Sequence, residues 1–100
     1  EVKRKLDAER TAALSSLMLA HERALRASKR VEHAAALAAA RRGELEVGTA
    51  LPLNVVLAET DLARAKNEHV DAVVERALAI AKLDFIDGRA EPTRATGGAK

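Results

Sequence analysis

Two helix-length segments, separated by a short stretch that contains Gly48 and Pro52, constrain this chain most strongly. The first segment spans about residues 2–45 and the second about residues 50–87. A single continuous helix would have to accommodate Gly48 and Pro52 together, at a cost of roughly 4 kcal/mol. We therefore predict an all-α fold, a long antiparallel helical hairpin whose arms pair as a coiled coil.

Both segments carry apolar and small residues at alternating steps of three and four, which is the spacing of a coiled-coil seam. The two seams of the first segment are Leu14, Leu17, His21, Ala24, Ser28, Val31, Ala35, Ala38 and Leu6, Ala13, Leu17, Ala20, Ala24, Ala27, Val31, Ala34, Ala38. The two seams of the second are Leu53, Val56, Thr60, Ala63, Asn67, Val70, Val74, Ala77, Ala81 and Val55, Ala58, Leu62, Ala65, His69, Ala72, Arg76, Ala79, Leu83, Ile86. Because an isolated hairpin needs one packing face per helix, the second seams predict neighbouring helices, as in a bundle or a larger α-barrel.

The small size of the apolar residues supports long, close helix packing rather than a thick globular core. Alanine supplies about a quarter of the chain, while there is one Phe, one Met and neither Trp nor Tyr. Alanine favours helices but buries little surface. The chain has no cysteine, which excludes disulfides and thiolate metal ligands.

Charge divides unequally between the two segments. Residues 1–42 hold ten Lys and Arg against five Asp and Glu, giving +5, and residues 50–87 hold four against seven, giving −3. Opposite charges favour pairing of the two segments with each other. The absence of a uniformly basic surface and of aromatic stacking platforms argues against nucleic-acid binding.

The sequence divides into four expected parts. These are a first long helix over 1–46, a tip turn over 47–51, a second long helix over 52–88, and a flexible or extended tail over 89–100. No apolar run approaches the ~18 residues needed to cross a bilayer, so we expect that the segment does not span a membrane.

Glycine, threonine and proline mark the expected helix ends. Gly48 is placed to adopt the left-handed conformation that ends the first helix, and Thr49 to cap the second through its hydroxyl. Pro52 falls in the first turn of the second helix, where its missing N–H costs nothing. Gly88 is expected to end that helix as its C-cap.

Histidines are the first candidates for acid–base or metal chemistry, and their positions do not support it. Folding about Gly48 sets His21 opposite Glu75 and leaves His21, His33 and His69 spread along the rod. No metal-ligand motif, catalytic arrangement or glycine-rich phosphate loop is present. The sequence therefore predicts a structural and interaction element, without catalytic residues, cofactor or metal, rather than an enzyme.

The turn is apolar where a hairpin end in water should be polar, because Leu45, Val47, Leu51 and Leu53 lie in or beside it. Two interpretations follow. These side chains form a local cap that closes the end of the pair, or they form a docking tip that meets another helical protein end to end.

Over residues 39–88 the sequence resembles the TolC-like outer-membrane efflux proteins. The family pattern has a helix ending in a Val-Gly-Thr turn, a hydrophobic stretch, an alanine-rich helix and a final Leu before a Gly. The matching positions are Val47, Gly48, Thr49, Val55 to Ala58, Leu62, Ala65, Ala72, Leu83 and Gly88. The first helix agrees only in length and heptad character.

The resemblance implies one hairpin of a periplasmic α-helical tunnel that serves efflux or type I secretion in the bacterial cell envelope. In such proteins a trimer forms the tunnel, and the tips dock on the hairpins of a membrane-fusion adaptor. The implied tip contacts are Leu45, Val47, Gly48, Thr49, Ala50 and Leu51. Two alternatives are the hairpin of a periplasmic adaptor and a generic coiled-coil oligomerisation module.

The sequence departs from the family pattern at the gate. Some members close the tip with an aromatic residue, an Arg after the Val-Gly-Thr turn and nearby Asp residues. Those places are occupied here by Leu45, Ala50, Asn54 and Leu57. A gating network of ion pairs is therefore not expected.

Overall fold

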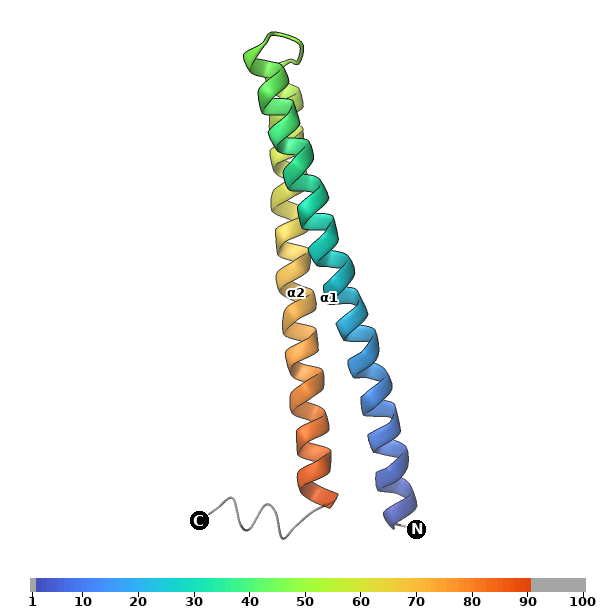
Figure 1. The fold of residues 1–100 in the computed structure, drawn as a ribbon. Coiled ribbons are helices and arrows are strands. Elements are labelled where there is room, and N and C mark those ends of the chain that lie inside the picture. Colours follow the sequence, from blue (N-terminus) through green and yellow to red (C-terminus); the bar gives the residue numbers. More distant parts are fainter. Residues whose placement is uncertain (1, 91–100) are drawn as a thin grey trace.

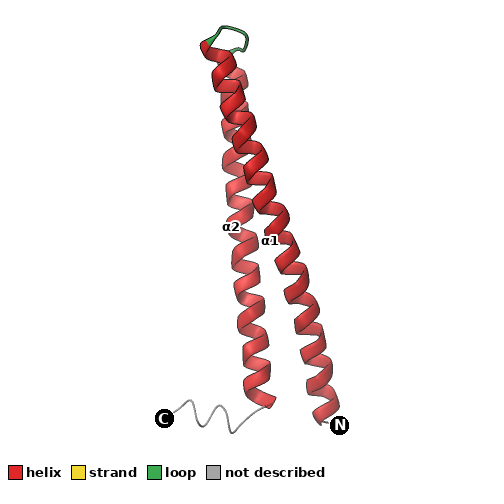
Figure 2. Ribbon diagram, in the orientation of Figure 1, coloured by secondary structure: helices red, strands yellow, loops and turns green. Residues whose placement is uncertain are grey.

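Two long helices folded back on each other make up the described part of the chain. The computed structural model describes residues 2–90, with side chains up to Gly88. Helix α1 covers Val2–Glu46 and helix α2 covers Pro52–Ala90 (Figure 1). Over residues 2–90 the two helices are joined by one short loop and no strand is present (Figure 2). The predicted all-α antiparallel hairpin is confirmed, with a long dimension of 68 Å.

The expected end of the second helix at Gly88 is wrong, because α2 continues to Ala90. Among the described residues, the glycine with a positive φ is Gly48, so Gly88 keeps a helical backbone. Glycine inside a helix costs about 1 kcal/mol relative to alanine. That cost is small enough for the helix to continue through Arg89 and Ala90, which are both strong helix formers. Of the expected tail, residues 91–100 lie outside the described residues.

The buried core between the helices is made almost entirely of alanine. Its members are Ala13, Ala20, Ala24, Ala27, Ala38, Ala58, Ala65, Ala72 and Ile86. Alanine side chains let the two helices approach closely, since the distance between packed helices depends on the side chains at the contact. Large apolar side chains lie mostly outside this core: seventeen of them, over both helices and the turn, are exposed.

Each helix uses one of its two predicted seams inside the hairpin. On α1 the seam that begins at Leu6 is buried or half-buried throughout, while Leu14 and His21 of the other seam are exposed. On α2 the seam that begins at Val55 is buried or half-buried, and every member of the seam that begins at Leu53 is exposed. The hairpin therefore leaves a complete apolar seam of α2 without a packing partner in this chain.

Ion pairs between the helices all run from an arginine of α1 to an acidic residue of α2 in the described part of the chain. They join Arg10 to Asp87 at 3.1 Å, Arg23 to Glu75 at 3.3 Å, Arg30 to Glu68 at 2.9 Å, and Arg42 to Glu59. This arrangement matches the predicted charge complementarity of the two segments. Because the side chains are largely exposed, each pair contributes about 1 kcal/mol or less and fixes alignment more than stability.

Candidate docking tip

The turn between the helices has the hydrogen bonds of a Schellman motif. Gly48 has φ of 82°, the left-handed conformation predicted for it. Its N–H donates to the Leu45 carbonyl at 3.1 Å, and the Thr49 N–H donates to the Glu44 carbonyl at 2.8 Å. These two bonds satisfy carbonyls that the end of α1 would otherwise leave without donors. The backbone of the turn is thereby tied to the last turn of α1.

The predicted role of Thr49 as the cap of the second helix is wrong. Its hydroxyl donates to the Glu44 carbonyl at 3.2 Å, so it adds a further bond to the end of α1. Pro52 begins α2 in the predicted position, where no N–H is needed. The Leu51 carbonyl accepts the Asn54 N–H at 2.9 Å and closes the first turn of α2.

Two ion pairs hold the base of the turn. Arg41 bonds Glu44 at 2.8 Å within α1, and Arg42 bonds Glu59 across the two helices. The second pair ties the last turns of α1 to the first turns of α2. Together with the Schellman bonds, it fixes the turn on both sides.

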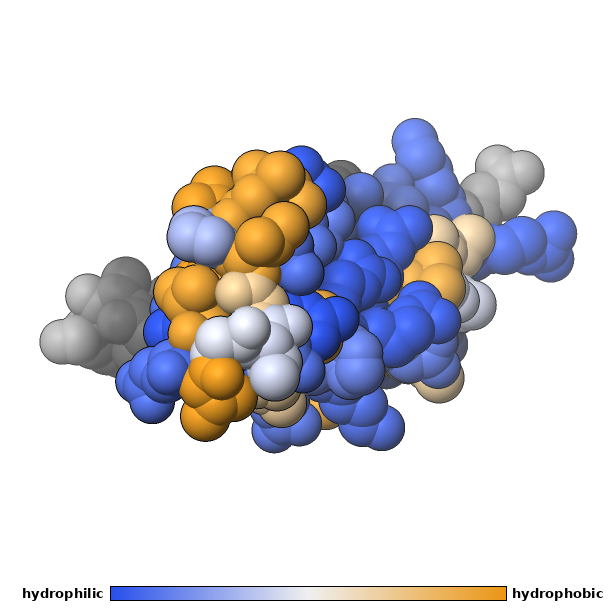
Figure 3. Space-filling view, turned by 90° about the horizontal axis from the view of Figure 1, so that it is seen from above, coloured by the Kyte–Doolittle hydropathy of each residue, from blue (hydrophilic) through white to orange (hydrophobic). Residues whose placement is uncertain are grey.

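We define the apolar tip as Leu45, Val47, Leu51 and Leu53. Their exposed fractions are 37%, 74%, 67% and 62% respectively. Seen end-on, apolar side chains gather at this end of the molecule (Figure 3). The interpretation of these residues as a local cap is therefore wrong for Val47, Leu51 and Leu53, because a closing cap would cover them. Within this hairpin they contact water.

The other implied contact residues lie in the same loop with unequal access. Gly48 and Thr49 are exposed, whereas Ala50 is half-buried. Sequence analysis did not single out Val56 and Leu57 as tip residues, although both are exposed just after the first turn of α2. The signal was available, because both positions fall outside the α2 seam that packs on α1.

The histidines do not form a site. His21 and His33 are exposed and His69 is half-buried, and among residues 2–90 no group of three or more His, Asp or Glu side chains could hold a metal ion. The fold also shifts the predicted pairing of His21 with Glu75. Glu75 bonds Arg23 instead, and the midpoint of that pair is residue 49, because the turn is centred on Thr49 rather than Gly48.

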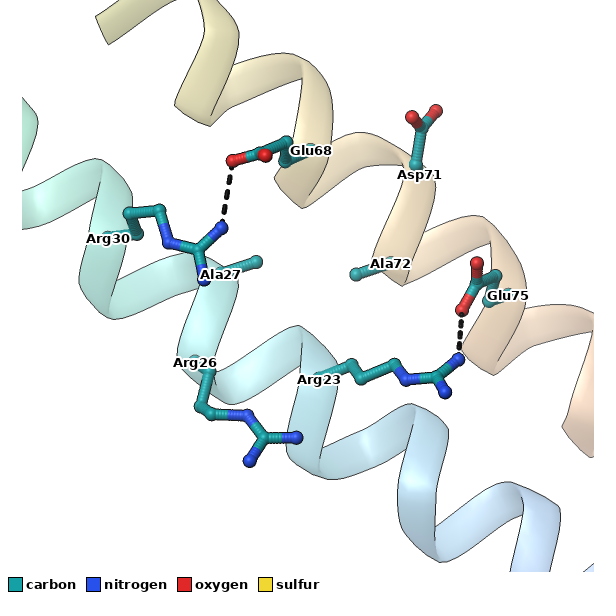
Figure 4. Close-up of a pocket in the computed structure, with 8 residues that line it drawn as sticks. All are labelled: Arg23, Arg26, Ala27, Arg30, Glu68, Asp71, Ala72 and Glu75. Atoms are coloured by element: carbon teal, nitrogen blue, oxygen red, sulfur yellow. Dashed lines mark hydrogen bonds and ion pairs between the residues drawn. The ribbon is translucent and has the colours of Figure 1, made fainter. Parts of the chain in front are cut away.

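A charged groove of about 340 Å³ crosses the middle of the hairpin (Figure 4). The methyl groups of Ala27 and Ala72 line it between two interhelical ion pairs, Arg23 with Glu75 and Arg30 with Glu68. Each of these charges is matched by its partner across the groove. The groove therefore offers neither an unpaired charge aimed into it nor a nucleophile beside a base, and it is best explained as part of the helix pairing.

Comparison with protein-family models, curated proteins and solved structures finds no match to this chain. Within residues 2–90, neither helix contains a stretch long and apolar enough to span a membrane. The functional argument therefore depends on the geometry of the tip and on the sequence resemblance over residues 39–88.

Proposed function

We propose that this chain is the periplasmic coiled-coil hairpin of a TolC-like outer-membrane channel for efflux or type I secretion, and that its tip docks on a membrane-fusion adaptor. The role is structural rather than catalytic. The observation that carries the proposal is the exposed apolar tip on a turn that is tied down on both sides.

A fixed turn supports docking because little order has to be created on binding. Loops and side chains that become immobile at an interface lower the affinity. Here the Schellman bonds at Gly48 and the ion pair from Arg42 to Glu59 already hold the backbone in the free hairpin. The exposed side chains of Val47 and Leu51 are then free to enter apolar pockets of a partner.

The resemblance over residues 39–88 supports the choice of partner. In the family it resembles, the Val-Gly-Thr turn is the part that meets the adaptor hairpins, and that turn is Val47, Gly48 and Thr49 here. The departures at Ala50 and Asn54 remove the charged gate but leave an apolar contact surface. The proposal therefore covers docking and excludes a gate built from ion pairs at these positions.

The outward distribution of large apolar side chains supports assembly with further helices. A core of alanines with Ile86 buries little surface, while Met18, Leu78, Phe85 and other large side chains remain exposed. Contiguous exposed apolar surface marks interaction sites. In the proposed channel, hairpins of a trimer would cover these faces from both sides.

Two rival functions make different predictions about the tip. A periplasmic adaptor also has a helical hairpin, but its tip resembles Arg-Leu with a following Leu and Ser, and residues 47–51 lack that pattern. A generic oligomerisation module would associate along its length and leave the tip without a partner. Binding that depends on the tip therefore separates the proposal from the oligomerisation module.

Truncation of Val47 tests the proposal. Val47→Ala removes the equivalent of two methylenes, at about 0.8 kcal/mol each when buried. Since 74% of the side chain is exposed in the free hairpin, docking can bury at most that share. The expected loss is about 1.2 kcal/mol, or roughly eightfold in Kd for a purified membrane-fusion adaptor.

Met18→Ala is the matched control, since Met18 is 66% exposed on α1 and lies far from the turn. We expect its Kd for the adaptor to stay within about twofold of the unmodified chain. The measurement is surface plasmon resonance against a panel of purified adaptors. The proposal fails if none of them binds, or if Met18→Ala weakens binding as much as Val47→Ala.

A further inference from the structure

The exposed seam of α2 is the largest surface that the tip proposal does not use. We call it the outer α2 face; its members are Leu53, Val56, Thr60, Ala63, Asn67, Val70, Val74, Ala77 and Ala81. All nine are exposed, and seven of them are Leu, Val or Ala. A helix face with this 3–4 spacing is suited to pack against another helix.

A row of four residues at seven-residue spacing runs beside the outer α2 face. In chain order the flanking row is Leu57, Arg64, Asp71 and Leu78, and all four are exposed. Its order is mirrored about the centre, since a leucine stands at each end and two opposite charges stand between them. A row of this kind is complementary to itself when read backwards.

An antiparallel second copy of α2 would satisfy that row completely. Leu57 would meet Leu78 of the second copy, and Arg64 would meet Asp71 of the second copy, with both contacts repeated by the twofold axis. The two kinds of pair share one midpoint, between positions 67 and 68. The outer α2 face spans 53–81 and is centred on the same place. Positions at the edge of a coiled-coil seam are those that set partner and orientation.

The two charges of the flanking row are available for a partner. Arg64 lies 3.8 Å from Asp61 on the same helix, and these side chains are 70% and 61% exposed, so the contact is weak. Asp71 makes no hydrogen bond or ion pair within residues 2–88, and its carboxylate points away from α1 (Figure 4). Neither charge is committed to holding the hairpin together.

We infer that the outer α2 face is a self-recognition surface, on which two copies of this chain pair through antiparallel α2 helices into a four-helix assembly. A parallel pair would set Arg64 against Arg64 and Asp71 against Asp71 of the second copy, which like-charge repulsion opposes. Antiparallel pairing replaces both repulsions by attractions. It is an isologous contact, the commonest kind in homodimers.

This inference goes beyond tip docking and does not depend on it. Antiparallel pairing leaves the two apolar tips at opposite ends of the assembly, so a tip variant such as Val47→Ala should not change self-association. A tunnel with all tips at one end needs a different neighbour for α2, so the inference concerns the 100-residue chain by itself.

Charge exchange within the flanking row tests the inference by sedimentation equilibrium. We expect the unmodified chain to form a dimer of twice its 10.7 kDa mass. Arg64→Asp makes both charge pairs repulsive and should raise the dimer Kd about tenfold or more. Asp71→Arg should do the same. The double variant Arg64→Asp/Asp71→Arg exchanges the charges and should restore the Kd to within about threefold.

Arg26→Asp is the control of equal charge change, because Arg26 lies on α1 and points away from α2 (Figure 4). We expect it to leave the dimer Kd unchanged. Far-UV circular dichroism checks that each variant stays helical. A monomer at every concentration, or a dimer whose Kd ignores the single variants, overturns the inference.

Orientation is tested by cross-linking, which is clean because the chain has no cysteine. Asn67→Cys lies near the proposed axis and should cross-link to its own copy through a short bis-maleimide. Ala81→Cys lies at the end of the outer α2 face and should not. Cross-linking at both positions would indicate a parallel pair and contradict the inference.

Discussion

Replacement of Gly48 by alanine is expected to destabilise the hairpin, whereas the same replacement at Gly43 or Gly88 is expected to stabilise it. A Cβ added at any of the three meets no heavy atom within 4 Å. Packing therefore does not enter, and only backbone conformation distinguishes the sites. Gly48 has φ of 82°, while Gly43 and Gly88 lie inside α1 and α2.

The magnitudes follow from these conformations. Alanine in the left-handed region costs roughly 1–2 kcal/mol, so Gly48→Ala should lower the free energy of unfolding by about that amount. Alanine in a helix is more favourable than glycine by about 1 kcal/mol, so Gly43→Ala should raise it. The two variants should therefore differ by roughly 2–3 kcal/mol, although their chemical change is identical.

Urea denaturation followed by far-UV circular dichroism measures these differences, with the protein concentration held constant because association would shift the midpoint. Gly88→Ala repeats the helical test near the other end of the hairpin. If Gly48→Ala is as stable as the unmodified chain, the account of the turn is wrong. A destabilising Gly43→Ala would instead contradict the extent of α1.

Two further predictions concern the contact between the helices. Ala27 is buried against Ala24 and Ala72, so Ala27→Leu should overpack the seam and lower the free energy of unfolding by about 1–3 kcal/mol, while Ala36→Leu on the exposed side of α1 should change it little. For the ion pair between Arg30 and Glu68, a double-mutant cycle to alanine should give a coupling energy of about 1 kcal/mol or less; a value of 3 kcal/mol would mean that this exposed pair stabilises the fold and does not merely align it.

The hairpin itself could be predicted because its signals are local and agree with one another. Gly48 provides the positive φ, Pro52 provides a helix start, and the segments on both sides have no comparable break. The arginines of the first segment and the acids of the second favour the same pairing, and the structure joins them. Agreement among independent signals is what specifies a fold.

The details that failed were decided by competition between two similar options. The Thr49 hydroxyl could serve either helix, and it bonds the Glu44 carbonyl because the Schellman turn brings that acceptor within reach. Gly88 could end α2 or continue it, and the continued helix keeps its backbone bonds at a cost of about 1 kcal/mol. Neither choice is visible in residue type alone.

The seams show the same limit at a larger scale. Both seams of α2 have the spacing of a packing face, and the sequence does not say which one α1 covers. In the structure, α1 covers the seam with smaller side chains at Ala58, Ala65 and Ala72, and larger ones such as Val56 and Val70 stay outside. Small side chains allow close pairing inside the hairpin, while large ones provide area for a partner. The candidate surfaces follow from this separation.

Methyl NMR spectroscopy tests the central claim, docking by the tip, most directly. The chain, labelled at valine and leucine methyl groups, is titrated with a purified membrane-fusion adaptor. We predict that the methyl resonances of Val47, Leu51 and Leu53 shift or broaden on binding, while those of Leu19 and Leu78, exposed far from the turn, stay unchanged. Changes at Leu19 or Leu78 with unchanged tip resonances would contradict tip docking and favour association along the helices.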